Sequence, residues 1–407
     1  MSLELSNRAE QMKANLIKWR RHLHRYPELS FQELETSKFV ERELKKIPGM
    51  KVEKAVGYST AVVGTLSSGT GFAIAIRADM DALPIQEQND VAYRSENDGV
   101  MHACGHDAHT AIVLGTAHLL SELFQEGHLQ GTVKFLFQPA EEHVDESGKS
   151  GAPYMIQAGV LEDVDAAIAL HMSPENRFGE VQIHDGYGMA NADVFKAKII
   201  ASGGHGAYPH LGTDPFWMLT PVLQALYGIP GRRTSPLESA VVTIGSIHGG
   251  STSNVIPTTV EIQGTIRSYT PEVRDTLYEE IQNAFQMVKN FGGDYDLQFI
   301  QEDPALKNDP RVNHIIKNVI KDVFSHFHII DKPFGLAGED FAHMAQKVPA
   351  AMFFLGCAVD GKLRNLHTPD FDIDERVLPA GASILAEAAR RFLTGEIGVT
   401  GTRGVSL

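Results

Sequence analysis

Residues 71–81 read GFAIAIRADMD, an apolar run that closes on two aspartates, Asp79 and Asp81. A short, continuous apolar run favours a strand that is buried on both faces. Residues 131–142, GTVKFLFQPAEE, follow the same plan with two glutamates, and residues 165–174, DAAIALHMSP, follow it with His171. Residues 106–124, HDAHTAIVLGTAHLLSELF, have helical spacing instead. Buried strands that alternate with helices predict an α/β domain with a mostly parallel sheet and helices on both faces.

The composition limits the class of protein. A chain of 407 residues exceeds one ordinary core and favours two domains. Apolar residues make up 43% and charged residues 21%, which is typical of a soluble globular protein. No apolar run is long enough to span a bilayer, and the amphipathic N-terminal segment lacks the apolar centre of a secretion signal, so we expect a cytoplasmic protein without a membrane partner. A formal net charge of −15 disfavours nucleic acid as a partner.

A second pattern interrupts the first one. Between residues 192 and 300 the order is strand, helix, strand, strand, helix, strand, and the α/β pattern resumes at residues 309–324, DPRVNHIIKNVIKDVF. This βαββαβ order predicts a compact ferredoxin-like domain inserted into a larger one. The predicted domains are residues 1–189 with 304–407, and residues 190–303.

Several predicted strands end in side chains that bind metals. The carboxyl ends of parallel strands meet at one edge of a sheet, where ligands bind. Thiolate, imidazole and carboxylate groups together suit Zn²⁺ and its first-row neighbours. Five ligands exceed one tetrahedral site, so the sequence predicts two metal ions that clamp a water and a carbonyl group together. The candidate ligands are Cys104, His106, Glu142, His171 and His367.

The adjacent glutamates have separate predicted roles. Successive side chains at a strand end point in opposite directions, so one glutamate can bind metal while its neighbour acts as general base. The residues alone do not decide which of Glu141 and Glu142 has which role. Each motif also has a plainer interpretation, because a lone histidine after a strand is usually structural and paired glutamates are usually solvated. The joint occurrence of these residues at one predicted edge favours the metal site.

Motifs along nearly the whole chain resemble the aminoacylase/carboxypeptidase type of metal-dependent amidohydrolase. The branch they are most similar to contains hippurate hydrolases, indole-acetyl-amino-acid hydrolases and N-acetyl amino-acid deacetylases. The motifs are RRHLHRYPELSFQE (20–33), RADMDALP (77–84), MHACGHDAHTA (101–111), FQPAEE (137–142), GGHGAYPH (203–210), SNVIP (253–257), GTIRSY (264–269), AGEDF (337–341) and LHTPDFD (366–372).

The resemblance implies a role for each matching residue. It implies a catalytic domain that holds two divalent ions, either Mn, Zn, Co or Ni, and a smaller inserted lid domain. The implied metal ligands are the five candidates above. Glu141 would be the general base, and Asp81 would orient a metal ligand. Asp79 stands where the broader peptidase family has a ligand histidine, and Cys104 with His106 replaces that family's aspartate-centred bridge, a departure that matches the deacetylase branch.

The implied lid residues would act on the substrate. His205, among the glycines of GGHGAYPH, would stabilise the oxyanion of a tetrahedral intermediate, from its own subunit or from a partner. Asn254 and Arg267 would hold polar groups of the substrate, and the planar guanidinium of Arg267 suits a carboxylate. The lid would form a homodimer or a higher homo-oligomer, because an unpaired strand edge invites a second chain.

The hypothesis that follows is hydrolysis of the amide bond of N-acyl amino acids by a metal-activated water. One alternative is a dipeptidase or carboxypeptidase, which the Cys-containing motif disfavours. An alternative of another class is a non-catalytic protein that binds metal or a small ligand on the same fold. Glu141 argues against it, because a binding protein needs no base beside its ligands.

Overall fold

The chain forms two compact units in a computed structural model that describes residues 2–362 and 364–396. Among the described residues, the first unit contains 2–186, the segment Lys307–Phe334 and those from Asp340 to position 396. The second contains Tyr187–Leu306 together with Gly335–Glu339, a short segment that the sequence placed in the catalytic domain. Two short strands, β7 (Gly186–Met189) and β14 (Leu306–Asn308), lie near the points where the chain changes unit.

An eight-stranded sheet forms the centre of the first unit, in the order β1-β2-β4-β3-β5-β16-β6-β15. Its four middle strands, β4, β3, β5 and β16, are parallel neighbours, while β1, β2 and β6 add antiparallel pairs. The bounds are β1 (Lys51–Lys54), β2 (Val62–Ser67), β3 (Ala73–Asp79), β4 (Thr132–Gln138), β5 (Ala166–Arg177), β6 (Glu180–Gln182), β15 (His328–Ile330) and β16 (Ala350–Ala358).

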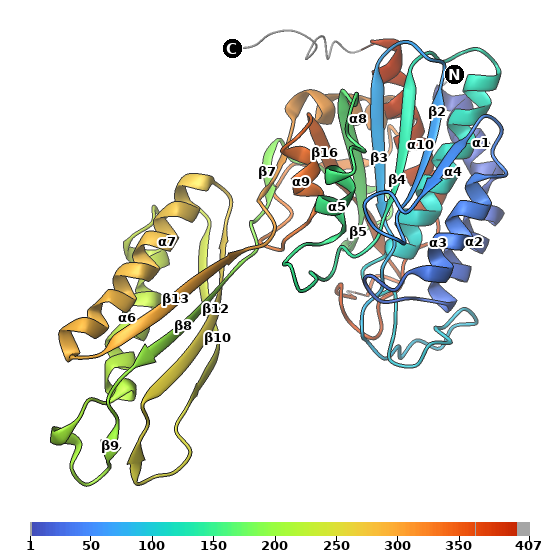
Figure 1. Cartoon of the computed structure of the whole chain (residues 1–407). Helices are drawn as coiled ribbons and strands as arrows, with labels where there is room; N and C mark the ends of the chain where they lie inside the picture. The colour runs from blue at the N-terminus through green and yellow to red at the C-terminus, as the bar shows by residue number, and fades with distance from the viewer. Residues whose placement is uncertain (1, 363, 397–407) are drawn as a thin grey trace. The chain divides into compact units, whose positions relative to one another are not determined.

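Helices cover both faces of this sheet (Figure 1). Ile74, Ile76 and alternate residues of the neighbouring strands pack with α4 and α10 in the main apolar core. Arg77 and Gln138 face the opposite way and bond Asp340 at the start of α9. The bounds are α1 (Ser2–Gln11), α2 (Lys13–Arg25), α3 (Leu34–Leu44), α4 (His106–Gln125), α5 (Gly151–Gln157), α8 (Pro310–Val323), α9 (Phe341–Ala345) and α10 (Val377–Thr394).

The second unit is a four-stranded antiparallel sheet, in the order β10-β12-β8-β13, with α6 and α7 packed on one face. Alternate residues of β8 are buried, which is the period expected when one face is covered. The bounds are β8 (Asp193–Ile200), β9 (Gly204–His205), α6 (Pro215–Arg232), β10 (Ala240–Gly249), β11 (Val255–Ile256), β12 (Thr259–Ser268), α7 (Pro271–Gln286) and β13 (Asp294–Gln301), with single 3₁₀ turns at Pro209–Leu211 and Met287–Phe291.

Helix starts follow from local sequence. Asp214, Thr270 and Asp309 each precede a proline, and each side chain accepts a backbone N–H of the first helical turn in α6, α7 and α8. The capping side chain satisfies a backbone N–H that has no partner within the helix, and the proline fixes φ at a value that suits the first turn. The predicted fold class, a mostly parallel α/β domain with an inserted βαββαβ domain, is confirmed. Within the described ranges, every helix is too short or too polar to cross a bilayer.

Candidate metal centre

The carboxyl ends of β3, β4, β5 and β16 meet at one edge of the first unit's sheet. The structure brings all five candidate ligands together there. The ligand atoms of Cys104, His106 and His171 lie within 4.8 Å of one another, and so do those of Cys104, Glu142 and His367. Cys104 and His106 stand at the start of α4, and the backbone N–H of His367 donates to the carbonyl of Ala103 at 2.8 Å. Cys104 belongs to both groups, which suits two neighbouring ions.

The spacing of these atoms fits shared metal ions. Sγ of Cys104 is 3.4 Å from Nε2 of His171. Oε1 of Glu142 is 3.2 Å from Nε2 of His367 and 3.8 Å from Nε2 of His106. Ligands bound tetrahedrally at about 2.0–2.3 Å from one ion lie about 3.3–3.8 Å from each other. Nε2 of His106 and Oε1 of Glu142 are buried and have no hydrogen-bond partner among the described residues, a rare condition that a cation would relieve.

Two histidines present the nitrogen that a metal needs. Nδ1 of His171 donates to the carbonyl of Met172 at 2.8 Å, and Nδ1 of His106 donates to the carbonyl of Asp81 at 2.9 Å. Each ring therefore turns Nε2 toward the cluster, as a second hydrogen bond does for metal-binding histidines. Burial, with His109 nearby, lowers the pKa of His171 well below its usual value, so this imidazole is neutral.

Charge in the cluster also favours a cation. Burial, with Glu142 and Glu141 nearby, raises the pKa of the Cys104 thiol well above its usual value. Burial opposes the charged form of His106, but Asp79, Asp81 and Glu142 outweigh it and raise its pKa to about 10. The cluster by itself thus keeps protons on both groups, and divalent cations would replace them. Since the thiolate is the reactive form, these surroundings disfavour Cys104 as an unaided nucleophile.

Two buried aspartates support the ligands. Oδ2 of Asp81 accepts the backbone N–H of Glu142 at 3.0 Å, and its Oδ1 is 3.3 Å from Nδ1 of His106. Asp79 accepts Nδ1–H of His109 at 2.6 Å and pairs with Arg77 at 2.6 Å. Oδ2 of Asp79 also lies 3.6 Å from Nε2 of His106, and Asp79 forms a third group of possible metal ligands with His106 and His109.

Glu141 lies beside the cluster, with a carboxylate oxygen within 4.8 Å of ligand atoms of His106 and Glu142. The strand-end alternation that the sequence suggested for the two glutamates is wrong, because β4 ends at Gln138. Pro139 and Ala140 intervene, and Ala140 has φ +49°, a left-handed conformation that is uncommon for alanine. The direction of Glu141 is therefore set by this turn rather than by the pleat of a strand.

The expectation that a strand ends at His171 is also wrong. β5 continues through Arg177 and pairs with β16 beyond that point. His171 nevertheless reaches the cluster, because Arg77 of β3 pairs with Ala169 of β5, so His171 is level with the end of β3 at Asp79.

The three predicted lid residues lie in the second unit. His205 and Val255 are paired on β9 and β11, which places Asn254 beside His205. The side chains of His205 and Asn254 are exposed, and Nδ1 of His205 accepts the backbone N–H of Ala207 at 3.0 Å. The strands β9 and β11 form a separate two-stranded sheet that follows Ile200, the last residue of β8, whereas Arg267 in β12 lies level with the other end of β8, at Asp193. The strand β8 between these two ends spans Asp193–Ile200, about 23 Å at about 3.3 Å per residue.

Sequence reasoning assigned no role to at least two buried carboxylates near the centre, Asp340, which has an oxygen within 4.8 Å of one of Glu141, and Glu33. Glu33 is fully buried, and its Oε1 accepts the backbone N–H of Ala140 at 2.8 Å, directly before Glu141. Its only sequence signal was its position at the end of the motif RRHLHRYPELSFQE. His109 was expected to be structural or to support the ligands, and it bridges Asp79 and the backbone N–H of Met172.

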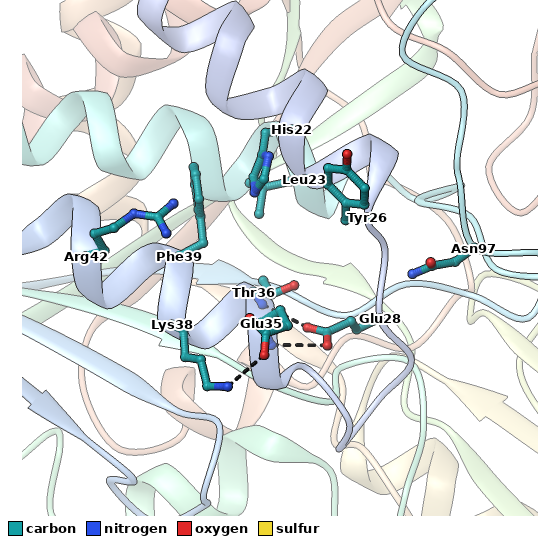
Figure 2. A pocket seen from close by; sticks show the side chains of 10 residues that line it. All are labelled: His22, Leu23, Tyr26, Glu28, Glu35, Thr36, Lys38, Phe39, Arg42 and Asn97. Carbon is teal, nitrogen blue, oxygen red and sulfur yellow. Dashed lines mark hydrogen bonds and ion pairs between the residues drawn. The ribbon is translucent and has the colours of Figure 1, made fainter.

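A separate cavity of about 370 Å³ lies on the surface of α2 and α3 (Figure 2). Stacked rings of His22 and Phe39, with centroids 4.5 Å apart, form one wall, and Arg42 lies over Phe39. The carboxylate of Glu28 on the opposite side accepts the backbone N–H groups of Glu35 and Thr36 at the start of α3. The metal-ligand candidates do not line this cavity, so we do not assign it to the centre.

The fold and the cluster together define a class, the metal-dependent hydrolases of amide bonds. Residues 75–391 match the sequence profile of Peptidase family M20/M25/M40, and the chain belongs to this family. The resemblance inferred from the motifs is confirmed.

Relatives in this family have several named activities. The chain is 36% identical over 394 residues to thermostable carboxypeptidase 1 of Saccharolobus solfataricus, covering 96% of this chain and 98% of the relative. It is 38% identical over 389 residues to N-acetyl-L-cysteine deacetylase of Bacillus subtilis, covering 94% and 89%. It is 37% identical over 381 residues to IAA-amino acid hydrolase ILR1-like 4 of Arabidopsis thaliana, covering 92% and 84%.

A solved structure supports the metal assignment. The YXEP protein of Bacillus subtilis, described as a dinuclear metal binding peptidase from the M20 family, has a TM-score of 0.82 and 32% identity to this chain. The match covers 95% of this chain and 99% of that one. Together with the overlapping ligand groups, this similarity supports a centre for two divalent metal ions.

Proposed function

We propose that the protein hydrolyses the amide bond of N-acyl amino acids. The observation that carries this proposal is the position of Glu141, a carboxylate beside a buried cluster of Cys, His and Glu ligands. Cys104, His106, Glu142, His171 and His367 would hold the ions. Two bound divalent ions would supply positive charge that polarises the acyl carbonyl and makes a water more acidic.

Glu141 would carry the proton through the reaction. Its carboxylate takes a proton from the attacking water, and the hydroxide forms the new bond to the acyl carbon. The same carboxyl group then gives the proton to the nitrogen of the leaving amino acid as the C–N bond breaks. Asp81 would keep His106 and the backbone of Glu142 in place through the bonds described above. The products are a carboxylic acid and a free amino acid.

The second unit would recognise the substrate. Nδ1 of His205 accepts a hydrogen bond, so its Nε2 carries the proton and can donate to a developing oxyanion. Oδ1 of Asn254 accepts from the hydroxyl of Thr252 at 3.0 Å, which leaves the amide N–H groups of Asn254 as donors. Arg267 would bind the substrate carboxylate. Because His205 lies on β9, beyond the Ile200 end of β8, and Arg267 lies level with the Asp193 end of β8, we propose that one active site takes them from two different chains.

Dimerisation through the second unit is therefore part of the proposal. Most of the exposed large apolar side chains lie in that unit, and an interface would cover such groups. They are Tyr208, Leu211, Phe216, Trp217, Tyr227, Leu237, Ile247 and Val255. We also propose a cytoplasmic location, because a Cys104 ligand must stay a reduced thiolate.

Mn, Zn, Co and Ni are all compatible with the mixed sulfur, nitrogen and oxygen ligands. A panel of N-acetyl and N-benzoyl amino acids, dipeptides and peptides, each assayed with one of these metals, identifies both metal and substrate class. Preference for dipeptides or peptides would favour the dipeptidase or carboxypeptidase alternative, to which the similarity with a thermostable carboxypeptidase lends weight. No turnover with fully loaded metals would favour a binding protein.

The direct test of the mechanism is Glu141→Gln. We expect the variant to keep its metal ions, measured by elemental analysis, while kcat falls by about 10²-fold or more, since general base catalysis contributes about 10²–10⁴-fold. Glu146→Gln is a matched control, because Glu146 is an exposed carboxylate in the following loop. Turnover of Glu141→Gln close to that of the control would refute the role of Glu141.

A further inference from the structure

The backbone on both sides of Glu141 is held by a buried carboxylate. On one side Oε1 of Glu33 accepts the N–H of Ala140 at 2.8 Å. On the other side Oδ2 of Asp81 accepts the N–H of Glu142 at 3.0 Å. A general base must stay within hydrogen-bond reach of the proton it takes, so two fixed neighbouring peptides restrict where its carboxylate can lie.

Glu33 also holds the segment from which it comes. The same Oε1 accepts the N–H of Phe31 at 2.9 Å, and Oε2 accepts the hydroxyl of Thr60 at 2.9 Å. Phe31 has φ +67° and Ala140 has φ +49°, so one carboxylate oxygen binds two residues in left-handed conformations. Such conformations persist where the surrounding structure holds them, and they concentrate at functional sites.

The connection from α2 to α3 is anchored at further points. Ser30 Oγ donates to Oδ2 of Asp81 at 2.7 Å. The carboxylate of Glu28 accepts the N–H of Glu35 at 3.1 Å and that of Thr36 at 2.8 Å (Figure 2). Residues 28–33 thus form a brace, with Glu33 buried, between the start of α3 and the two loops that carry Asp81 and Glu141.

We propose that Glu33 is a positioning residue for Glu141. It acts through the peptide of Ala140 and does not contact a metal ligand or the substrate. The proposal rests on the proposed role of Glu141 as general base. It gives the motif RRHLHRYPELSFQE, to which no role was assigned, a place in the reaction.

Two substitutions at Glu33 distinguish the effect of side-chain length from the effect of side-chain charge. Glu33→Gln keeps an acceptor oxygen at the same reach and loses the charge. Glu33→Asp keeps the charge but is shorter by one methylene and cannot hold Ala140 and Thr60 together. If Glu33 positions by hydrogen bonding, Glu33→Asp lowers kcat about tenfold or more with KM and metal content unchanged, because misplacement by about 1 Å costs up to about 10²-fold. Glu33→Gln stays within about threefold of wild type.

Glu387 provides the matched control. It is a fully buried carboxylate in α10 that binds Ser2, Arg390 and Arg391, away from the centre. We expect Glu387→Asp to lower the melting temperature but leave kcat unchanged. If Glu33→Asp fails to fold, Thr60→Val is the second variant: it leaves Glu33 in place, removes one partner and lowers kcat about threefold.

The double variant with Glu141→Gln separates this proposal from the function itself. With Glu141 replaced, Glu33→Asp should lower the residual kcat no further. An unchanged kcat in both Glu33→Asp and Thr60→Val, or loss of metal from Glu33→Asp, overturns the role of Glu33 while Glu141 stays the base. Near-normal turnover of Glu141→Gln instead overturns the proposed function.

Discussion

Asp107 opens α4 next to His106, and its buried side chain balances a buried arginine. Oδ2 of Asp107 accepts from Nε of Arg20 at 2.8 Å and lies 2.8 Å from Nδ1 of His24. Burial favours the neutral acid, but Arg20 and His24 outweigh it and hold the pKa of Asp107 well below its usual value. Removing one partner of a buried pair leaves an uncompensated charge.

Asp107→Asn should lower the free energy of unfolding of the metal-free protein by about 3–5 kcal/mol at neutral pH. Because the folded pKa is depressed, the stability that Asp107 contributes is present above its unfolded pKa of about 3.9 and is lost as the pH falls below it. The variant should therefore lose less stability than wild type on acidification below about pH 4. Denaturant unfolding in chelator at several pH values measures this. Asp90→Asn, at an exposed position, is the control and should behave as wild type.

For single residues, the sequence predicts which side chains lie near one another but not how each side chain is oriented. The five ligand candidates could be found because each lies in or after a buried strand or at the start of a helix. The brace at Glu33 could not, because its bond to Ala140 joins positions 107 residues apart and depends on a left-handed alanine. No local pattern encodes such a contact.

The hairpin of β10 and β12 shows how tightly the second unit's sheet is built at one point. Gly264 in β12 lies against Phe195 and the backbone of Thr243, and a Cβ there would be 2.4 Å from the carbonyl oxygen of Thr243. Gly245 in β10 has open space, because a Cβ at that position would meet no atom of the described chain within 4 Å beyond its own chain neighbours.

Gly264→Ala should therefore destabilise the second unit by about 1–3 kcal/mol, as overpacking in a core does. Gly245→Ala in the same hairpin should change the free energy of unfolding by less than about 0.5 kcal/mol. Chemical denaturation of the two variants side by side gives both values. Equal losses would show that the contact with Thr243 is relieved by a shift of the sheet.

Element types followed from sequence more readily than element ends. The Asp-Pro and Thr-Pro pairs identify the starts of α6, α7 and α8, because the cap and the proline act within one turn. The end of β5 could not be read in the same way. Its continuation to Arg177 depends on pairing with Ala358 of β16, which lies 181 residues later in the chain.

For the whole molecule, the proposed exchange of His205 between two chains can be tested by complementation. A mixed dimer of His205→Ala and Glu141→Gln contains one site with an intact Glu141 and an intact His205 from the partner. Random mixing of the two inactive variants should thus restore about one quarter of wild-type activity in a twofold dimer. Sedimentation of wild type should show the dimer. No recovery in mixed dimers would place His205 in its own chain's site.

The discontinuous organisation was visible at the scale of the whole sequence because the strand and helix order changes at both ends of the inserted domain. The sequence does not show that the segment Gly335–Glu339 belongs to the second unit, because five residues are too few to form a recognisable hydrophobic pattern. A contact explains why this segment belongs to the second unit. Gly338 leaves room for the guanidinium of Arg267, whose Nη1 would lie 3.3 Å from a Cβ at that position.

Both cysteines, Cys104 and Cys357, are buried, so the chain has no readily accessible native thiol. A cysteine introduced at exposed Lys38 in the first unit and another at exposed Gln282 in the second would be the preferred sites for thiol-reactive dyes. Fluorescence energy transfer between such dyes could then follow the separation of the two units during turnover, without replacing a native residue of the metal centre.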